Sequence, residues 1–84
     1  MPRFYFDLNE CGDVTLDEEG VELPDAAAAT AHATFAAREI MSAEIKEGRL
    51  CLGCALYVRE GERLLSIVWF KDTITIAGQD AARS

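Results

Sequence analysis

The sequence predicts an α+β fold in which a four-stranded antiparallel sheet carries one long helix on one of its faces. Two strand-like segments precede residue 24, an alanine-rich stretch without glycine or proline occupies residues 26–47, and two further strand-like segments follow residue 54. This β-β-α-β-β order is typical of a sheet with a single covering helix. A chain of 84 residues fits one domain. We assign that domain to residues 1–77 and a flexible C-terminal tail to residues 78–84.

The first two strands are predicted to form a hairpin. Residues 3–9 alternate between apolar and polar side chains, as a strand with one buried face does. Residues 9–13 are rich in turn formers and include Gly12, which can take a positive φ. We therefore expect residues 14–17 to pair back on the first strand.

The helix has recognisable start and stop signals. Residues 21–23 extend toward Pro24, and a proline pushes the residue before it out of the helical region. Asp25 is the expected N-cap, because its carboxylate can accept hydrogen bonds from the free N–H groups of the first turn. Alanine has the highest helix propensity, so the helix should continue to Gly48, which is suited to end it.

Small apolar residues recur along this helix at three- and four-residue spacing and predict a narrow buried stripe. Phe35 falls on roughly the opposite side of the helix and is expected to face solvent. The expected stripe consists of Ala29, Ala33, Ala36, Ile40 and Ala43, flanked by Ala37 and Met41.

The second half of the chain predicts another hairpin. Residues 55–59 and 63–70 have the composition of strands, and residues 60–62 form a turn between them. Residues 73–76 are predicted as a short fifth strand.

The fourth strand is apolar on both of its faces, although one helix covers only one face of a sheet. A homodimer that packs sheet on sheet would bury the second face and would stabilise a chain too short for a large core. The alternative is that residues 17–23 and the tail cover this face. The expected division places Leu65, Ile67 and Trp69 on one face and Leu64, Val68 and Phe70 on the other.

The charge of the chain restricts its partners. The formal net charge is −7 at pH 7, and the eight Lys and Arg residues are scattered. Nucleic acids and anionic lipids are bound through clustered basic residues, so neither is an expected partner. A basic protein is the natural complement, and Asp17, Glu18 and Glu19 form an acidic edge for it. This edge lacks the ligand register of an EF-hand, so calcium binding is not expected.

The sequence favours a cytoplasmic location. Charged Arg3 and Asp7 come too early for the apolar core of a signal peptide. No apolar run approaches the roughly 20 residues that span a bilayer, so no membrane association is expected. Three cysteines, an odd number, argue against a disulfide framework.

Cys51 and Cys54 form a C-x-x-C motif. Redox-active pairs of this kind sit at a helix N-terminus, which lowers a thiol pKa, whereas this pair follows the helix. Zinc prefers four ligands, and Cys11 and His32 would complete a set of that size, but nothing in the spacing forces these two residues to meet the pair. We therefore expect no cofactor and two ordinary thiols. His32 is expected to be a helix residue at the boundary of the buried stripe, without a chemical role. A metal or redox role is the alternative.

Three segments of the sequence carry a resemblance to a known family. They are Met1–Phe6 (MPRFYF), residues 17–25 (DEEGVELPD) and the alanine-rich helix that ends in residues 47–50 (EGRL). Together they resemble a family of small bacterial domains of unknown function, over most of the chain. The resemblance implies no activity, ligand or catalytic residue. Members often carry a histidine where this chain has Asp7, and polar residues where it has residues 51–54 (CLGC).

These observations predict a non-catalytic interaction or regulatory domain, expected to be a homodimer that binds a protein partner. An enzyme is not expected, because no nucleophile, base and orienting group stand out together. One alternative is a small-molecule or metal-binding domain that uses the open sheet face or the C-x-x-C motif, and another is an antitoxin-like partner of a basic toxin. The expected partner-binding residues are Tyr5, Tyr57, Leu65, Ile67 and Trp69 on the sheet and Asp17, Glu18 and Glu19 on the acidic edge.

Overall fold

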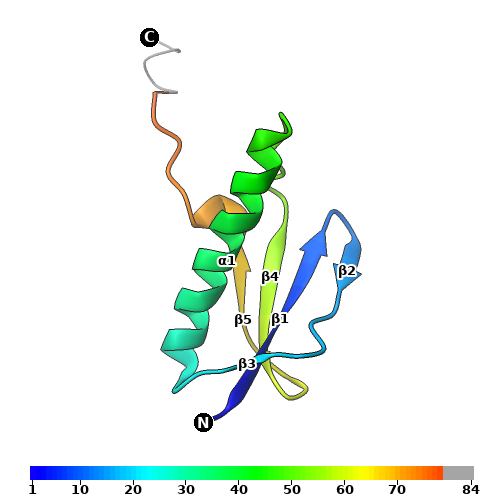
Figure 1. The fold of residues 1–84 in the computed structure, drawn as a ribbon, viewed down its shortest axis with the longest axis vertical. Coiled ribbons are helices and arrows are strands. Elements are labelled where there is room, and N and C mark those ends of the chain that lie inside the picture. The colour runs from blue at the N-terminus through cyan, green and yellow to red at the C-terminus, as the bar shows by residue number, and fades with distance from the viewer. Residues whose placement is uncertain (79–84) are drawn as a thin grey trace.

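The computed structural model describes residues 1–78 and shows the predicted α+β fold (Figure 1). The β-β-α-β-β order is confirmed, with two short additions, β3 and a 3-10 helix, η1. The predicted tail at 78–84 lies, from residue 79 onward, outside the described residues. The elements are β1 (Arg3–Glu10), β2 (Asp13–Thr15), β3 (Val21–Glu22), α1 (Ala26–Lys46), β4 (Ala55–Glu60), β5 (Arg63–Trp69) and η1 (Phe70–Asp72).

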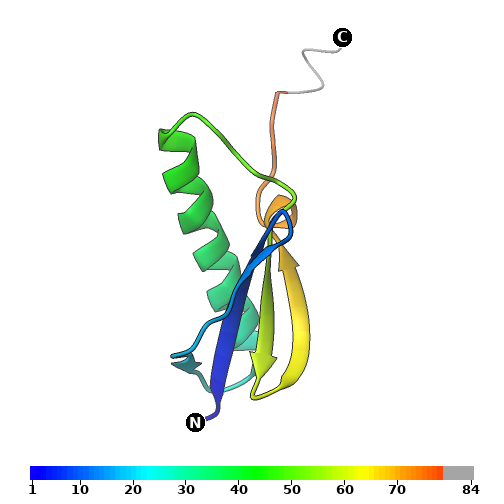
Figure 2. The same ribbon diagram turned by 90° about the vertical axis from the view of Figure 1, so that its right-hand side faces the viewer.

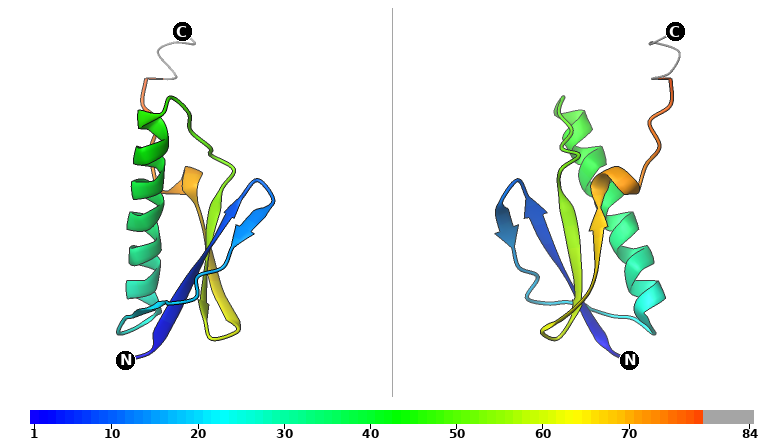
Figure 3. Two further views of the ribbon diagram at one scale, coloured as in Figure 1. Left: turned by 45° about the vertical axis from the view of Figure 1, so that its right-hand side comes forward. Right: turned by 180° about the vertical axis from the view of Figure 1, so that it is seen from behind.

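The strand order, which the sequence leaves open, is β2-β1-β4-β5, and β3 also pairs with β1 (Figure 3). All of these pairs are antiparallel. Phe4 pairs with Val21 of β3 and with Glu60 of β4, so β3 lies on the same edge of β1 as β2 does. The central strands are therefore β1 and β4, and β5 forms an edge of the sheet.

The helix forms one layer and the sheet the other (Figure 2). Asp25 caps the helix as predicted, because its Oδ1 accepts a hydrogen bond from the Ala28 N–H at 2.8 Å. The helix ends at Lys46, and Gly48, with φ +88°, supports the turn that follows.

The buried stripe of α1 differs from the predicted one. Its fully buried residues follow a strict four-residue spacing, which corresponds to one ridge of the helix. Ala36 and Ile40 lie half-buried at its margin, and Ala43 is exposed. The buried stripe is therefore rotated toward the residues predicted to flank it, Ala37 and Met41. The buried residues are Ala29, Ala33, Ala37 and Met41.

The chain after β5 does not form the predicted fifth strand. β5 ends at Trp69, and the fully buried Phe70 opens η1. The Thr73 hydroxyl donates to the Phe70 carbonyl at 2.8 Å, and Arg38 Nε donates to the Thr73 carbonyl at 2.8 Å. These contacts turn the chain away from the sheet toward α1, so residues 73–76 have no strand partner among the described residues.

An irregularity between β4 and β5 changes which side chains share a face. Val58 pairs with Ser66, but Arg59 pairs with Leu64, so Leu65 is an extra residue in β5. Leu65 packs against the core, and Leu64 joins the face that carries Arg59. The expectation that Leu65 shares a face with Ile67 is therefore wrong.

No helix within residues 1–78 is long and apolar enough to cross a membrane.

Candidate functional site

The face of the sheet opposite the helix is open (Figure 2). Directly paired residues share a face, so Tyr57, Ile67 and Trp69 lie together on it. β3 lies in the sheet as an edge strand, and the segment before it contacts this face at Asp7 and Arg59. Residues 17–23 therefore cover part of the face but leave its β5 side open. The tail, the other part of the alternative cover, lies from residue 79 onward outside the described residues. Three large apolar side chains of β5 are notably exposed here: Leu64 at 52%, Ile67 at 38% and Trp69 at 40%.

An ion pair occupies the middle of the open face. Arg59 Nε donates to Asp7 Oδ2 at 2.7 Å, and the guanidinium lies 4.6 Å from the centre of the Tyr5 ring. The hydrogen bond with Asp7 raises the pKa of Arg59. The other guanidinium nitrogens donate to the carbonyls of Gly61 and Asp17 at 2.7 and 3.0 Å. The hydrogen-bond donors of the Arg59 guanidinium thus find their acceptors within the chain.

Asp17 is a structural residue rather than a free surface acid. Its carboxylate accepts hydrogen bonds from the backbone N–H groups of Phe6, Glu19 and Gly20, each at 3.1 Å. Burial alone would raise the pKa of Asp17, but these three N–H groups and Arg59 outweigh it and lower that pKa. Asp17 therefore anchors the segment between β2 and β3, which replaces the end of the longer second strand predicted from the sequence.

The remaining acidic edge is small. Glu18 and Glu19 are exposed and border an open groove of about 470 Å³ that Phe6 and Leu8 also line. With Asp17 held internally, these two carboxylates are the part of the predicted edge that a partner can reach.

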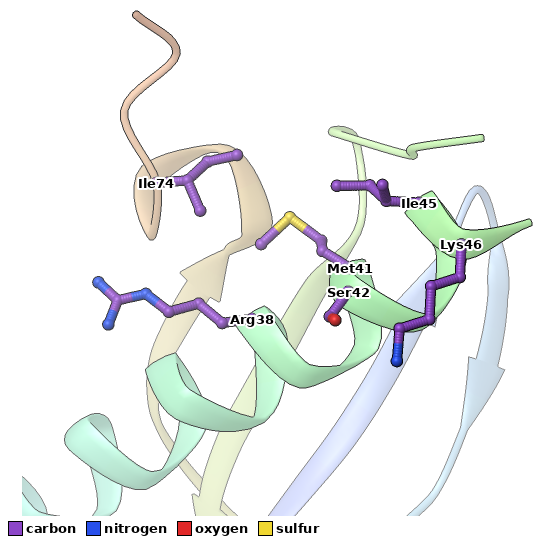
Figure 4. Close-up of a pocket in the computed structure, with 6 residues that line it drawn as sticks. All are labelled: Arg38, Met41, Ser42, Ile45, Lys46 and Ile74. Carbon is purple, nitrogen blue, oxygen red and sulfur yellow. The ribbon is translucent and has the colours of Figure 1, made fainter. Parts of the chain in front are cut away.

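A second groove, of about 350 Å³, lies between α1 and the segment after η1 (Figure 4). Met41 and Ile74 form its apolar floor, and Arg38, which also lines it, holds the Thr73 carbonyl. Ser42 is its only hydroxyl and has no histidine or carboxylate beside it among the lining residues. The groove therefore offers apolar surface without catalytic groups.

The three cysteines form a cluster that their spacing in sequence does not reveal. The Cys51 Sγ lies 2.7 Å from the Cys54 Sγ and 3.5 Å from the Cys11 Sγ, and all three sulfur atoms lie within 4.8 Å of one another. Nothing in the sequence spacing requires Cys11 to meet the motif, but the structure brings it there. His32 is not part of this cluster, and its ring lies tilted against that of Phe6 with centroids 4.7 Å apart.

Local backbone geometry brings the sulfur atoms together. Cys11 and Gly12 form the two-residue turn of the β1–β2 hairpin, with φ +51° and +94°. Cys54 is buried, and its carbonyl accepts the Phe70 N–H at 3.0 Å. The Cys51 N–H donates to Glu44 Oε1 of α1 at 3.3 Å. Three separate parts of the fold thus meet at this cluster.

The three thiols differ in acidity. Burial raises the pKa of Cys54 to about 12, and its hydrogen bond with Cys51 raises the pKa of Cys11. Hydrogen bonds from these two thiols lower the pKa of Cys51. The acidic neighbours Glu44 and Glu10 act in the opposite direction and disfavour thiolates.

Comparison with known proteins identifies a family but no characterised relative. No curated protein and no solved structure matches the chain. Residues 3–70 match the family described as Domain of unknown function (DUF6894), a span that runs from β1 to the start of η1 and includes all three cysteines. The chain therefore belongs to this family of domains of unknown function.

Proposed function

We propose that this domain is a non-catalytic interaction module that forms a homodimer through the open face of its sheet. The observation that carries the proposal is the exposure of Leu64, Ile67 and Trp69 together on a face that the helix leaves uncovered. Clustered apolar side chains of this size are typical of the buried centre of a protein interface.

The charges on this face support its burial. An unpaired charge is costly to remove from water, but Arg59 is already paired with Asp7 and bonded to two carbonyls. Covering the face with a second copy would therefore bury a satisfied ion pair. A chain of 84 residues also gains stability from an interface, because its own core is small.

Light scattering on a size-exclusion column tests the proposal. We expect wild-type protein at twice the 9.2 kDa mass of the chain. Ile67→Lys should give the monomer, because it places a charge at the centre of the interface. Ile45→Lys is the matched control: Ile45 is 58% exposed on the helix layer, so this variant should remain dimeric. Circular dichroism verifies that both variants are folded.

Two results would contradict the proposal. A wild-type monomer at the highest soluble concentration would exclude a stable homodimer. A dimer that Ile45→Lys dissociates and Ile67→Lys does not would move the interface to the groove beside α1 (Figure 4).

The setting and a second partner form part of the proposal. The resemblance to small bacterial domains supports a bacterial protein, and three cysteines without a disulfide support a reducing cytoplasm.

A basic partner protein, including a toxin, would bind this domain through Glu18 and Glu19. Asp17 contributes little to binding such a partner, because its carboxylate already accepts three backbone hydrogen bonds within the fold. Charge reversal at Glu18 and Glu19 should then abolish capture of that partner at low salt.

A further inference from the structure

We propose that Cys11, Cys51 and Cys54 form a binding site for a thiophilic closed-shell cation, Zn²⁺ or Cu⁺, held by three thiolates. This site is independent of the proposed dimer face. It rests on the convergence of three sulfur atoms from two distant loops, since Cys11 and Cys51 are 40 positions apart in the sequence.

The distances suit a shared ion after a small adjustment. Zinc–thiolate bonds of about 2.3 Å place tetrahedral sulfur ligands roughly 3.8 Å apart. The Cys11–Cys51 pair, at 3.5 Å, is close to that spacing, and the Cys51–Cys54 pair, at 2.7 Å, must widen by about 1 Å to reach it. Cys51, which is half-buried, is the residue of this pair that can move, because Cys54 is buried.

The backbone at Cys11 is a second and independent observation. Its φ of +51° lies in the left-handed region, where the first position of such a hairpin turn favours Asn, Asp or Gly. Packing of the Cys11 side chain does not compensate for this conformation, because Cys11 is exposed. A costly conformation at an exposed residue is explained if its side chain has a task. That side chain reaches Cys51, as a ligand must.

The electrostatic surroundings favour a cation over redox chemistry. Reactive thiolates are stabilised by nearby positive charge. Here the Glu44 carboxylate accepts the Cys51 N–H at 3.3 Å, which places a negative charge beside the cluster and disfavours thiolates in the absence of a cation. A bound ion reverses that effect and displaces the thiol protons as it binds.

Ligand chemistry selects the class of ion. Soft thiolates prefer Cu⁺ and Zn²⁺ over magnesium, calcium or manganese. Within residues 1–78, no histidine or carboxylate ligand atom joins the three sulfurs in the cluster. Three sulfurs are a full set for trigonal Cu⁺, whereas Zn²⁺ would keep a fourth position for water or another ligand. The exposed Cys11 leaves a path by which the ion can reach the buried Cys54.

Metal titration of the full chain, reduced and freed of metal under anaerobic conditions, tests the proposal. Co²⁺ serves as the optical probe for the Zn²⁺ arm, through its thiolate charge-transfer absorption and displacement by Zn²⁺. Competition with a chromophoric Cu⁺ chelator serves the second arm. We expect one equivalent of at least one ion to bind and raise the melting temperature.

Two variants locate the site. Cys11→Ser, at an exposed position, should keep the fold and weaken binding at least tenfold. His32→Gln removes the sequence's only histidine, which lies outside the cluster, and should bind as wild type does.

Three results would overturn the proposal. The first is three titratable thiols with neither Co²⁺ nor Cu⁺ bound. The second is equal affinity in wild type and Cys11→Ser, which would reduce the site to the C-x-x-C pair alone. The third is a Cys51–Cys54 disulfide that persists at the glutathione potential of a cytoplasm, which would indicate redox chemistry instead.

Discussion

Arg59 Nε donates to Asp7 Oδ2 at 2.7 Å across two neighbouring strands, on the face of the sheet that carries no helix. Only 10% of the Asp7 side chain is exposed, and its Oδ1 also accepts the Asp17 N–H at 2.8 Å. This carboxylate thus connects β1, β4 and the segment that follows β2.

Asp7→Ala should destabilise the domain by about 3 kcal/mol, because it leaves the Arg59 guanidinium partly buried without its ionic partner. The free energy of unfolding in urea measures the loss. Glu22→Ala is the control: it breaks an exposed pair with Arg3, which contributes less than about 1 kcal/mol. Equal losses in both variants would show that the Asp7–Arg59 pair stabilises no more than a surface pair does.

Acid should weaken the domain partly through Asp17. The folded-state pKa of Asp17 is lowered from its ordinary value of 3.8, so its contribution to stability is present above pH 3.8 and is lost as pH falls through the folded-state pKa. Asp17→Asn should therefore cost about 1–2 kcal/mol at pH 7, and this cost should shrink in strong acid. Melting temperatures between pH 7 and pH 2 measure it. The exposed Glu18→Gln should leave the pH profile unchanged; a matching change there would show a general charge effect.

Gly20→Ala should destabilise the domain by about 2–3 kcal/mol. Gly20 has φ +69°, and a Cβ there would lie 2.8–2.9 Å from Arg3 Cγ, the Phe4 carbonyl and the Tyr5 ring. Gly12→Ala isolates the effect of conformation: its φ is +94°, but no atom lies within 4 Å of the added Cβ, so about 1 kcal/mol is expected. Chemical denaturation compares the two. Equal losses of stability in the two variants would show that the close contact at Gly20 does not contribute to the destabilisation.

Phe70→Ala should cost about 3–5 kcal/mol, because Phe70 is fully buried and its loss leaves a cavity under η1. Phe35→Ala makes the same substitution at a side chain that is 63% exposed and should change stability by less than about 0.5 kcal/mol. Thermal unfolding followed by circular dichroism measures both. A small effect at Phe70 would mean that the C-terminal segment contributes little to the fold.

The elements of this fold are readable from local sequence. Pro24 and Asp25 mark the helix start, Gly48 marks its end, and the alanines between them have the highest helix propensity. The solvent position of Phe35 also follows from helical spacing, and the structure agrees. These features depend on neighbours along the chain, which a sequence shows directly.

The errors of sequence analysis occur where distant segments meet. Alternation assigns Leu65 to the face of Ile67, but one extra residue in β5 turns it toward the core. Residues 73–76 have strand composition, but Arg38 and the Phe70 carbonyl hold Thr73 away from the sheet. A register shift and a long-range hydrogen bond leave no local pattern to detect.

By itself, the sequence determined the α+β class, the helix and its caps, and an acidic chain with one strand that is apolar on both faces. Only the tertiary structure decided the strand order, the internal role of Asp17 and the meeting of Cys11 with Cys51 and Cys54. The physical reason is the range of the interactions. Propensity and periodicity act over a few residues, whereas a hairpin turn and a loop 40 residues away become neighbours only when β1 and β4 pair.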